Sequence, residues 1–166
     1  MSSSFNDKIS VYLDNEDDML DEFYAPDDFN LSSELEEYLI KEVSRRYKND
    51  KIKIYVEFKE DGSIEKFKEA VYNTFNKKVI SVGYDIKRNN LLSIATLIIG
   101  LLLAVMIYIL TDINTAFAQF LAIACWVFIW YSVETHFIVN RELKLEKIRY
   151  NQLVIAEITS KIKYER

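Results

Sequence analysis

The chain has little of the chemistry from which metal and redox sites are built. Cys125 is its only cysteine and His136 its only histidine among 166 residues. One thiol cannot form a disulfide framework or a redox pair, and one cysteine with one histidine cannot complete a zinc finger. No paired carboxylates or nucleophile constellation stand out either. We therefore expect no metal site, no catalytic residues and no enzyme activity.

Glycine and proline are also scarce, with three glycines and one proline in the whole chain. Gly62, Gly83 and Gly100 lie too far apart to form either common glycine-rich phosphate loop, so we expect no nucleotide cofactor. The first residues, MSSSFNDKIS, lack the basic and apolar regions of a signal peptide. The N-terminus is therefore predicted to stay on the side where the chain is made.

Charge almost disappears between residues 91 and 138, although 28% of the chain is charged. The run LLSIATLIIGLLLAVMIYIL (91–110) has no charge, and at about 1.5 Å per residue it covers the roughly 30 Å hydrocarbon core of a bilayer. A second run, AFAQFLAIACWVFIWYSV, follows after the short link TDINT. We therefore predict two transmembrane spans, 91–110 and 116–135, joined as an antiparallel helical hairpin.

Lysine and arginine flank these runs on one side only, since the connecting loop holds just one charged residue, Asp112. Basic residues near span ends are retained in the cytoplasm. The pattern predicts a multi-pass protein of the cytoplasmic membrane of a bacterium, with both termini in the cytoplasm. Anionic lipid explains the basic residues without nucleic acid. The residues expected to contact lipid headgroups are Lys87, Arg88, Arg141 and Lys144.

Three stretches outside the runs alternate between apolar and polar residues, which is typical of half-buried strands. They are KISVYLD, KIKIYVEFKE and LVIAEITSKIKYE. An isolated pair of strands is marginal in water, so we expect all three to share one sheet. In the last stretch the predicted inner face comprises Val154, Ala156, Ile158, Ile162 and Tyr164.

Two amphipathic helices are predicted beside these strands, in LSSELEEYLIKEVSRRY and SIEKFKEAVYNTFN. Ser33 with Glu36 would form a capping box on the first, and Ser63 would cap the second. The second helix has no proline to separate it from the first span, and Gly83 is the position where a bend is expected. The second span likewise meets no breaker before Asn151, so it should continue as a cytoplasmic stalk.

Together these patterns predict a helical transmembrane hairpin with a small cytoplasmic α/β domain that is split around it. The domain would hold a mixed sheet of about three strands and two helices. The predicted segments are an acidic N-terminal arm with a possible first strand (1–30), the α/β part with a juxtamembrane helix (31–90), the hairpin (91–135), and the stalk with the last strand (136–166).

The segment DNEDDMLDEFYAPDD, residues 14–28, holds eight acidic residues and no basic one. A calcium loop needs glycine at its sixth position and glutamate at its twelfth, where this segment has Met19 and Ala25. Such blocks of like charge repel themselves, which predicts a flexible linker. Apolar residues are interleaved with the acids, so residues 14–59 could also dock onto a basic cytosolic protein.

The stretch CWVFIWYSVETHF places Trp126, Trp130 and Glu134 on one helix face, since four residues advance about 400 degrees. Glu134 lies about 18 residues, or roughly 27 Å, from the outer end of its span, which is the cytoplasmic headgroup boundary. The tryptophans then belong to an interfacial aromatic belt or a helix contact. Handling of a proton or ion by Glu134 with His136 is the alternative.

Three other positions in the spans suit helix packing. Gly100 with Ala104 makes a pair of small residues that allows close helix approach, and Gln119 can hydrogen-bond another helix. Cys125 is expected to be a small packing residue.

Several of these motifs together resemble a group of small two-span bacterial membrane proteins of unknown function. The motifs are KIKIYVEF, a helix ending in AVYNTF, a basic juxtamembrane segment, the W-x3-W-x3-E ending of the second span, and RYNQLVIAEI after a charged stalk. The resemblance covers about residues 51–160 and matches the acidic position of that group to Glu134. It implies this architecture and no activity.

The function expected from these features is a non-catalytic membrane module that forms homo-oligomers as a scaffold or recruits a cytosolic partner. The alternative is an oligomeric ion pore or membrane-disrupting effector that is gated by its cytoplasmic domain in a stress or phage response. A membrane-bound enzyme comes third. A pore needs polar lining, and the spans offer only Ser93, Thr96, Gln119 and Ser132.

Overall fold

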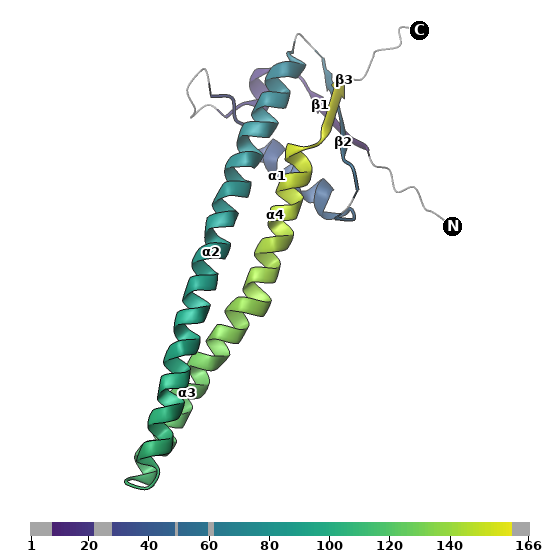
Figure 1. Ribbon diagram of the computed structural model, residues 1–166. Helices are drawn as coiled ribbons and strands as arrows, with labels where there is room; N and C mark the ends of the chain where they lie inside the picture. The colour runs from purple at the N-terminus through teal and green to yellow at the C-terminus, as the bar shows by residue number, and fades with distance from the viewer. Residues whose placement is uncertain (1–7, 22–27, 49, 60–61, 161–166) are drawn as a thin grey trace, which may run out of the picture. The chain divides into compact units, whose positions relative to one another are not determined.

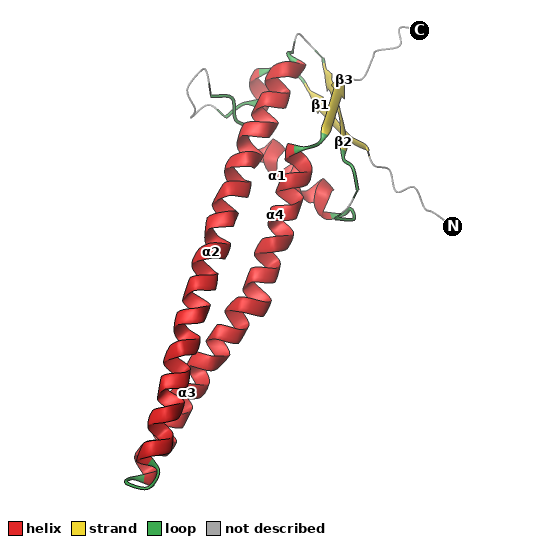
Figure 2. Ribbon diagram, in the orientation of Figure 1, coloured by secondary structure: helices red, strands yellow, loops and turns green. Residues whose placement is uncertain are grey.

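The computed structural model describes residues 8–21, 28–48, 50–59 and 62–160. Contacts divide the chain into two compact units, and each is described by itself. We call the described residues up to Ile80 and from Lys147 onward the head, and residues 81–146 the hairpin. The elements are β1 (Lys8–Leu13), a short 3-10 turn (Asp17–Met19), α1 (Ser33–Ser44), β2 (Lys53–Phe58), α2 (Ile64–Leu110), α3 (Thr115–Glu134), a π-helical turn (Thr135–Val139), α4 (Asn140–Val154) and β3 (Glu157–Ser160) (Figures 1 and 2).

The three predicted strands do share one sheet, in the order β1-β2-β3. Both strand pairs are parallel, with Ile9 opposite Ile54 and Ile54 opposite Ile158. The prediction of a mixed sheet is therefore wrong. Alternation identifies the two faces of a strand but not its direction. The crossover through α1, and the long excursion through the hairpin, each bring the chain back to start the next strand in the same direction.

The head has one apolar core between the sheet and its helices. On the sheet, Ile9, Val11, Ile54 and Val56 are at most 3% exposed, which confirms the inner face that alternation predicted. The apolar stripes predicted for the two helices are buried as well, with Leu35, Leu39 and Val43 on α1 and Phe67, Val71 and Phe75 on α2, except that Ile64 at the start of the second stripe is half-buried.

Side chains of α1 and of the residues just after it cover the outer edge of the sheet at β1. The Tyr38 hydroxyl donates to the backbone oxygen of Ser10 (3.0 Å), and the Arg46 guanidinium donates to that of Lys8 (2.9 Å). An uncovered edge strand offers its backbone to other chains. These two hydrogen bonds occupy carbonyl groups that would otherwise be available for strand addition.

Of the two predicted N-terminal helix caps, one is confirmed and the other is wrong. Ser63 precedes α2 and its hydroxyl accepts from the backbone N–H of Lys66 (3.3 Å), as predicted. The capping box on α1 is wrong, because the residue before the helix is Ser32, whose side chain donates to the backbone oxygen of Asp18. Glu36 instead accepts a hydrogen bond from Lys78 of α2.

The described part of the acidic segment is attached to the rest of the head at Glu16 and Met19. Met19 is fully buried, and Glu16 accepts hydrogen bonds from the backbone N–H of Ser63 and from the Lys66 ammonium. The prediction of a flexible linker is therefore wrong for residues 14–21. Lys66 of α2 pairs with Glu16. The prediction from the sequence considered only the charges within the segment and could not include such a long-range partner.

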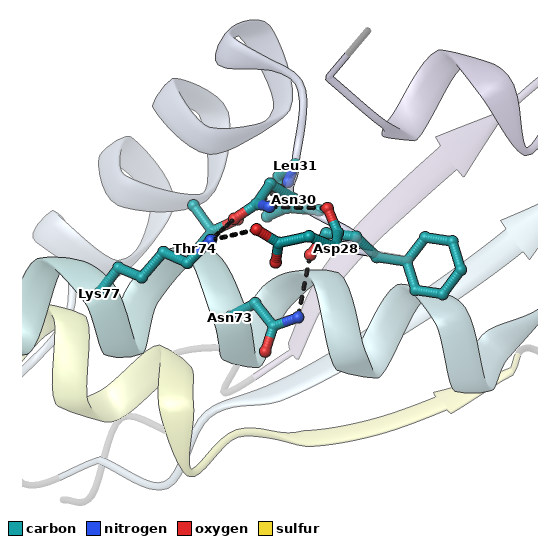
Figure 3. A network of polar contacts seen from close by, with 7 residues as sticks. Asp28, Asn30, Leu31, Asn73, Thr74 and Lys77 are labelled. Atoms are coloured by element: carbon teal, nitrogen blue, oxygen red, sulfur yellow. Dashed lines mark hydrogen bonds and ion pairs between the residues drawn. The ribbon is translucent and has the colours of Figure 1, made fainter. Parts of the chain in front are cut away.

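A second set of polar contacts holds the end of this segment on α2 (Figure 3). Lys77 pairs with Asp28 (2.8 Å) and donates to the side-chain oxygen of Asn30 (3.1 Å). One turn earlier, the Thr74 hydroxyl accepts from the backbone N–H of Leu31 (2.9 Å). Asn30 and Leu31 are each 3% exposed, so this attachment is part of the core of the head.

The last strand is shorter than predicted. Helix α4 continues through Val154, so Val154 is not on a strand, and β3 begins only at Glu157. Ile158 is 9% exposed and faces the core as predicted. The predicted inner-face residues Ile162 and Tyr164 lie outside the described residues. Leu153 is fully buried as part of α4, so its burial reflects helical and not strand periodicity, which is why alternation alone misplaced the boundary.

Candidate functional site

Among the described residues, two helical stretches are long and apolar enough to cross a membrane, judged by length and composition. One lies within α2, and the other starts with α3 and runs through the π-helical turn into α4. Only 17% of each apolar stretch is buried within the chain, so neither is the core helix of a folded globule. Helix α2 runs through the predicted bend at Gly83 without interruption.

The two helices of the hairpin meet along a seam of small side chains. On the part of α2 that follows Val82, the buried positions are Ser93, Thr96 and Gly100, which follow the three-and-four spacing of a helix contact. On α3 they are Ala118, Cys125 and Ser132, each seven residues from the next. Most of the large apolar side chains are exposed outside this seam, so the usual arrangement of a water-soluble helix pair is inverted.

The polar groups of the seam bond one another. The Ser93 hydroxyl donates to the backbone oxygen of Ser132 (2.9 Å), and the Ser132 hydroxyl donates to that of Ser93 (2.7 Å). The Thr96 hydroxyl lies 3.0 Å from the carbonyl oxygens of Leu92 and Ser93 in its own helix. Three of the four side chains expected to line a pore are therefore buried within one hairpin.

Gly100 is a point of close approach, as predicted. A Cβ atom on Gly100 would lie 2.8 Å from Cγ1 of Ile129 and 3.4 Å from the backbone nitrogen of that residue. The thiol of Cys125 donates to the backbone oxygen of Gly100 (3.2 Å). Ala104, the other member of the predicted small pair, is exposed. Ala104 therefore lies outside the seam, which runs from Gly100 to Ser93 on α2 and from Ser132 to Ala118 on α3.

Asn140 extends the seam past the π-helical turn. Its side-chain nitrogen donates to the side-chain oxygen of Asn90 (2.7 Å), and Asn140 itself is fully buried. Its own side-chain oxygen is buried without a hydrogen-bond partner. An uninterrupted seven-residue spacing from Ser132 would bring Val139 to this place. The extra residue of the π-helical turn brings Asn140 there instead.

The aromatic and ionisable residues singled out by sequence lie outside the seam. Trp126 and Trp130 are 64% and 50% exposed, and their rings stack on each other with centroids 5.8 Å apart. Glu134 and His136 are exposed as well, and the His136 ring contacts Phe137 edge-on rather than the carboxylate. Gln119 is exposed near the start of α3.

The basic residues predicted to meet lipid headgroups are all exposed on the hairpin. Arg88 pairs with Asp85 at 3.1 Å, and the Lys87 ammonium lies 5.9 Å from the centre of the Tyr84 ring. Arg141 and Lys144 follow the π-helical turn at the start of α4. Sequence reasoning found these cations but missed the Asn90–Asn140 pair, because the π-helical turn breaks the spacing that would have related the two residues.

Among the described residues, no group of three or more histidine, cysteine, aspartate or glutamate side chains could hold a metal ion. Comparisons with family models, with curated proteins and with solved structures found no match for this chain. The resemblance to two-span proteins thus stays a prediction, and the chain's own residues are the basis for a proposed function.

Proposed function

We propose that the protein is an integral membrane protein whose hairpin crosses the cytoplasmic membrane and holds the head in the cytoplasm as a non-catalytic module for assembly or partner recruitment. One observation carries this proposal. The hairpin bonds the hydroxyls of Ser93, Thr96 and Ser132 within its own seam and turns most of its large apolar side chains outward. Such a surface is suited to lipid, because hydrocarbon chains contact apolar side chains favourably but cannot hydrogen-bond polar groups.

The size of the outward surface supports this environment. Soluble monomers rarely expose apolar patches above a few hundred Å². On this hairpin, exposed apolar side chains follow one another through both helices and include both tryptophans. Members of this surface that are more than half exposed include Leu91, Ile94, Leu101, Leu102, Tyr108, Phe120, Ile123 and Trp126.

The charge distribution supports the proposed orientation. Lys87 and Arg88 on α2, and Arg141 and Lys144 on α4, lie at one end of the apolar stretches, and the turn at the other end carries Asp112. The positive end belongs in the cytoplasm and can contact anionic headgroups. Glu134 and the Trp126–Trp130 stack would then lie toward the same interface.

The pore alternative receives less support. Ser93, Thr96 and Ser132 are buried in the seam of one hairpin, so they cannot line a path between hairpins while that seam persists. Of the polar residues counted for a pore, Gln119 alone is exposed. A homo-oligomer fits better as a packing of apolar faces, and we propose the stacked pair Trp126 and Trp130 as part of its contact surface.

Cysteine labelling in cells tests insertion and orientation together. In a Cys125→Ala background, single cysteines at Asp112 and at Lys41 would be treated with a membrane-impermeant maleimide before and after permeabilisation. We expect the Asp112→Cys variant to react from the periplasmic side in intact cells and Lys41→Cys to react only after permeabilisation. Extraction of the chain by alkaline carbonate, or labelling of both sites only in broken cells, would contradict the proposal.

A further inference from the structure

The head has a hollow of about 530 Å³ whose wall is unlike the rest of this acidic chain. Three lysines line it: Lys48 and Lys51 from the loop before β2, and Lys147 from α4. Asp50 is the acidic residue in the lining, so the wall carries three positive charges against one negative charge. The whole chain has a net charge of -5, which makes a local excess of two positive charges unexpected.

These lysines lack the bound carboxylate that several other lysines of the head have. Lys53, Lys66 and Lys77 each pair with an acid at hydrogen-bond distance. Within the described part of the chain, none of the three lysines of the hollow forms an ion pair. Glu157, which pairs with Lys53, is near enough to Lys51 for that lysine to help lower the pKa of its carboxyl. Three like charges repel one another, and a bound anion removes that repulsion.

Hydrogen bonds from one lining residue fix the two sides of the hollow to each other. The buried side chain of Gln152 on α4 donates to the backbone oxygens of Tyr47 (3.0 Å) and Asp50 (3.1 Å). The loop that carries Lys48 and Lys51 is thereby tied to the helix that carries Lys147. The Asp50 carboxylate accepts from the backbone N–H of Tyr47 (3.1 Å), so one of its oxygens is engaged in the loop itself.

Apolar side chains complete the wall and restrict the class of ligand. Ile148 and Ile155 line the same hollow and are 39% and 71% exposed. Ligand sites of this volume typically combine apolar walls with a few polar groups that fix the charged end. The lysine ammonium is a point charge on a flexible side chain. It can bind phosphate oxygens and does not need a planar partner such as a carboxylate.

We propose that this hollow binds a phosphate-bearing ligand, with Lys48, Lys51 and Lys147 around the phosphate and the two isoleucines against its less polar part. The site goes beyond the proposed membrane role and does not depend on it. The phosphate can come from a soluble compound or from a lipid headgroup, and the chemistry at the lysines is the same.

The test uses the full chain in nanodiscs of phosphatidylcholine, with inorganic pyrophosphate as the probe. Binding is measured by calorimetry, and the reactivity of each lysine toward acetylation is read by mass spectrometry. We expect pyrophosphate to protect Lys48, Lys51 and Lys147 but not the exposed Lys41 of α1. A second arm replaces pyrophosphate with nanodiscs that contain phosphatidic acid. Protection in the first arm identifies a soluble source, protection only in the second identifies a headgroup, and protection in neither overturns the site.

Variants sharpen the result. Lys51→Gln should weaken pyrophosphate binding roughly fivefold, and the triple change of Lys48, Lys51 and Lys147 to glutamine should abolish it. The matched control changes Lys41, Lys59 and Lys68 to glutamine, which removes the same charge outside the hollow and should leave binding within about twofold. Asp50→Asn should strengthen binding, because it removes the one negative charge in the wall. Equal weakening by both triple variants would show that only overall charge matters and would overturn the proposal.

Discussion

Ser93 and Ser132 exchange hydrogen bonds across the hairpin, each hydroxyl donating to the other residue's backbone oxygen, at 2.9 and 2.7 Å. Their two hydroxyl oxygens lie 3.1 Å apart. This reciprocal pair ties the two helices at a place where neither helix carries a large side chain inward. It also removes two hydroxyls from the surface that we propose to face lipid.

The first prediction concerns this pair. Ser132→Ala removes the reciprocal donor but keeps the side chain small, so packing is retained. We expect the free energy of unfolding of the hairpin in bicelles to fall by about 1 to 2 kcal/mol. Thr111→Val is the control, because the exposed Thr111 hydroxyl donates only to Ile107 of its own helix (2.8 Å). An equal effect of the two variants would show that the bond across the seam contributes nothing.

Gly100 provides the second prediction. A methyl group there would meet Ile129 at 2.8 Å, so Gly100→Ala should destabilise the hairpin by about 1 to 3 kcal/mol. Ala104→Val adds bulk at an exposed position of the same helix and should have little effect. Adding Ile129→Ala to Gly100→Ala should recover part of the loss, which a double-mutant cycle measures. Strict additivity of the two changes would contradict direct contact.

The Asn90–Asn140 pair leads to the third prediction, which is an asymmetry. Asn140 is fully buried, whereas Asn90 is only partly buried and can reach surrounding water. Asn90→Ala leaves the whole Asn140 amide unbonded and should cost about 1 to 3 kcal/mol. Asn140→Leu removes the buried polar group itself and should cost less or stabilise the hairpin. The free energy of unfolding of both variants is measured in the same bicelles. A larger loss for Asn140→Leu than for Asn90→Ala would refute the burial argument.

The fourth prediction is a pH dependence of the head. The Lys66 hydrogen bond, with the backbone N–H of Ser63, lowers the pKa of Glu16 below its ordinary value of 4.5. A lowered pKa in the folded state contributes stability that is present above the unfolded value and is lost as the pH falls through the folded value. We therefore expect hydrogen exchange of the amides around Ser63 to accelerate below about pH 4.5.

The matched pair for this prediction is Glu16→Gln against Glu37→Gln. Both change the net charge equally, but Glu37 is exposed on α1. Glu16→Gln should reduce the acid sensitivity and lower stability at neutral pH by at most about 1 kcal/mol, as expected for a partly exposed ion pair. The same acid profile in Glu16→Gln as in the unchanged chain would exclude Glu16 as its source. Asp28, whose pKa the Lys77 ammonium also lowers, would then be the remaining carboxylate to examine.

Much of the architecture follows from local pattern. The spacing of Leu35, Leu39 and Val43 is enough to predict α1, and alternation in KIYVEF is enough to predict β2. The apolar runs predict the helices of the hairpin, because an uncharged run of this length matches the thickness of a bilayer and exceeds what a strand needs. Gly100 was recognisable as a contact point because close helix approach excludes a Cβ atom at such positions.

Long-range pairing could not be read in this way. The direction of the strands depends on how the chain returns to the sheet, and alternation carries no information on that. About fifty residues separate the partners in the ion pairs Glu16–Lys66 and Asp28–Lys77. The prediction for the acidic segment therefore considered only the repulsion among its own charges. In the hollow, Lys147 of α4 likewise follows Lys51 of the loop by 96 residues (147 minus 51).

The sequence by itself thus determined the helical hairpin, the alternating strands and the one-sided distribution of basic residues, because each follows from the periodicity or composition of one segment. Only the tertiary structure decided that the sheet is parallel, that Asn140 rather than Val139 meets Asn90, and that Lys48, Lys51 and Lys147 surround one hollow. The physical reason is the same in each case. Those features depend on which distant segments contact each other. Such contacts are determined by packing between side chains of different segments, which the pattern within one segment does not show.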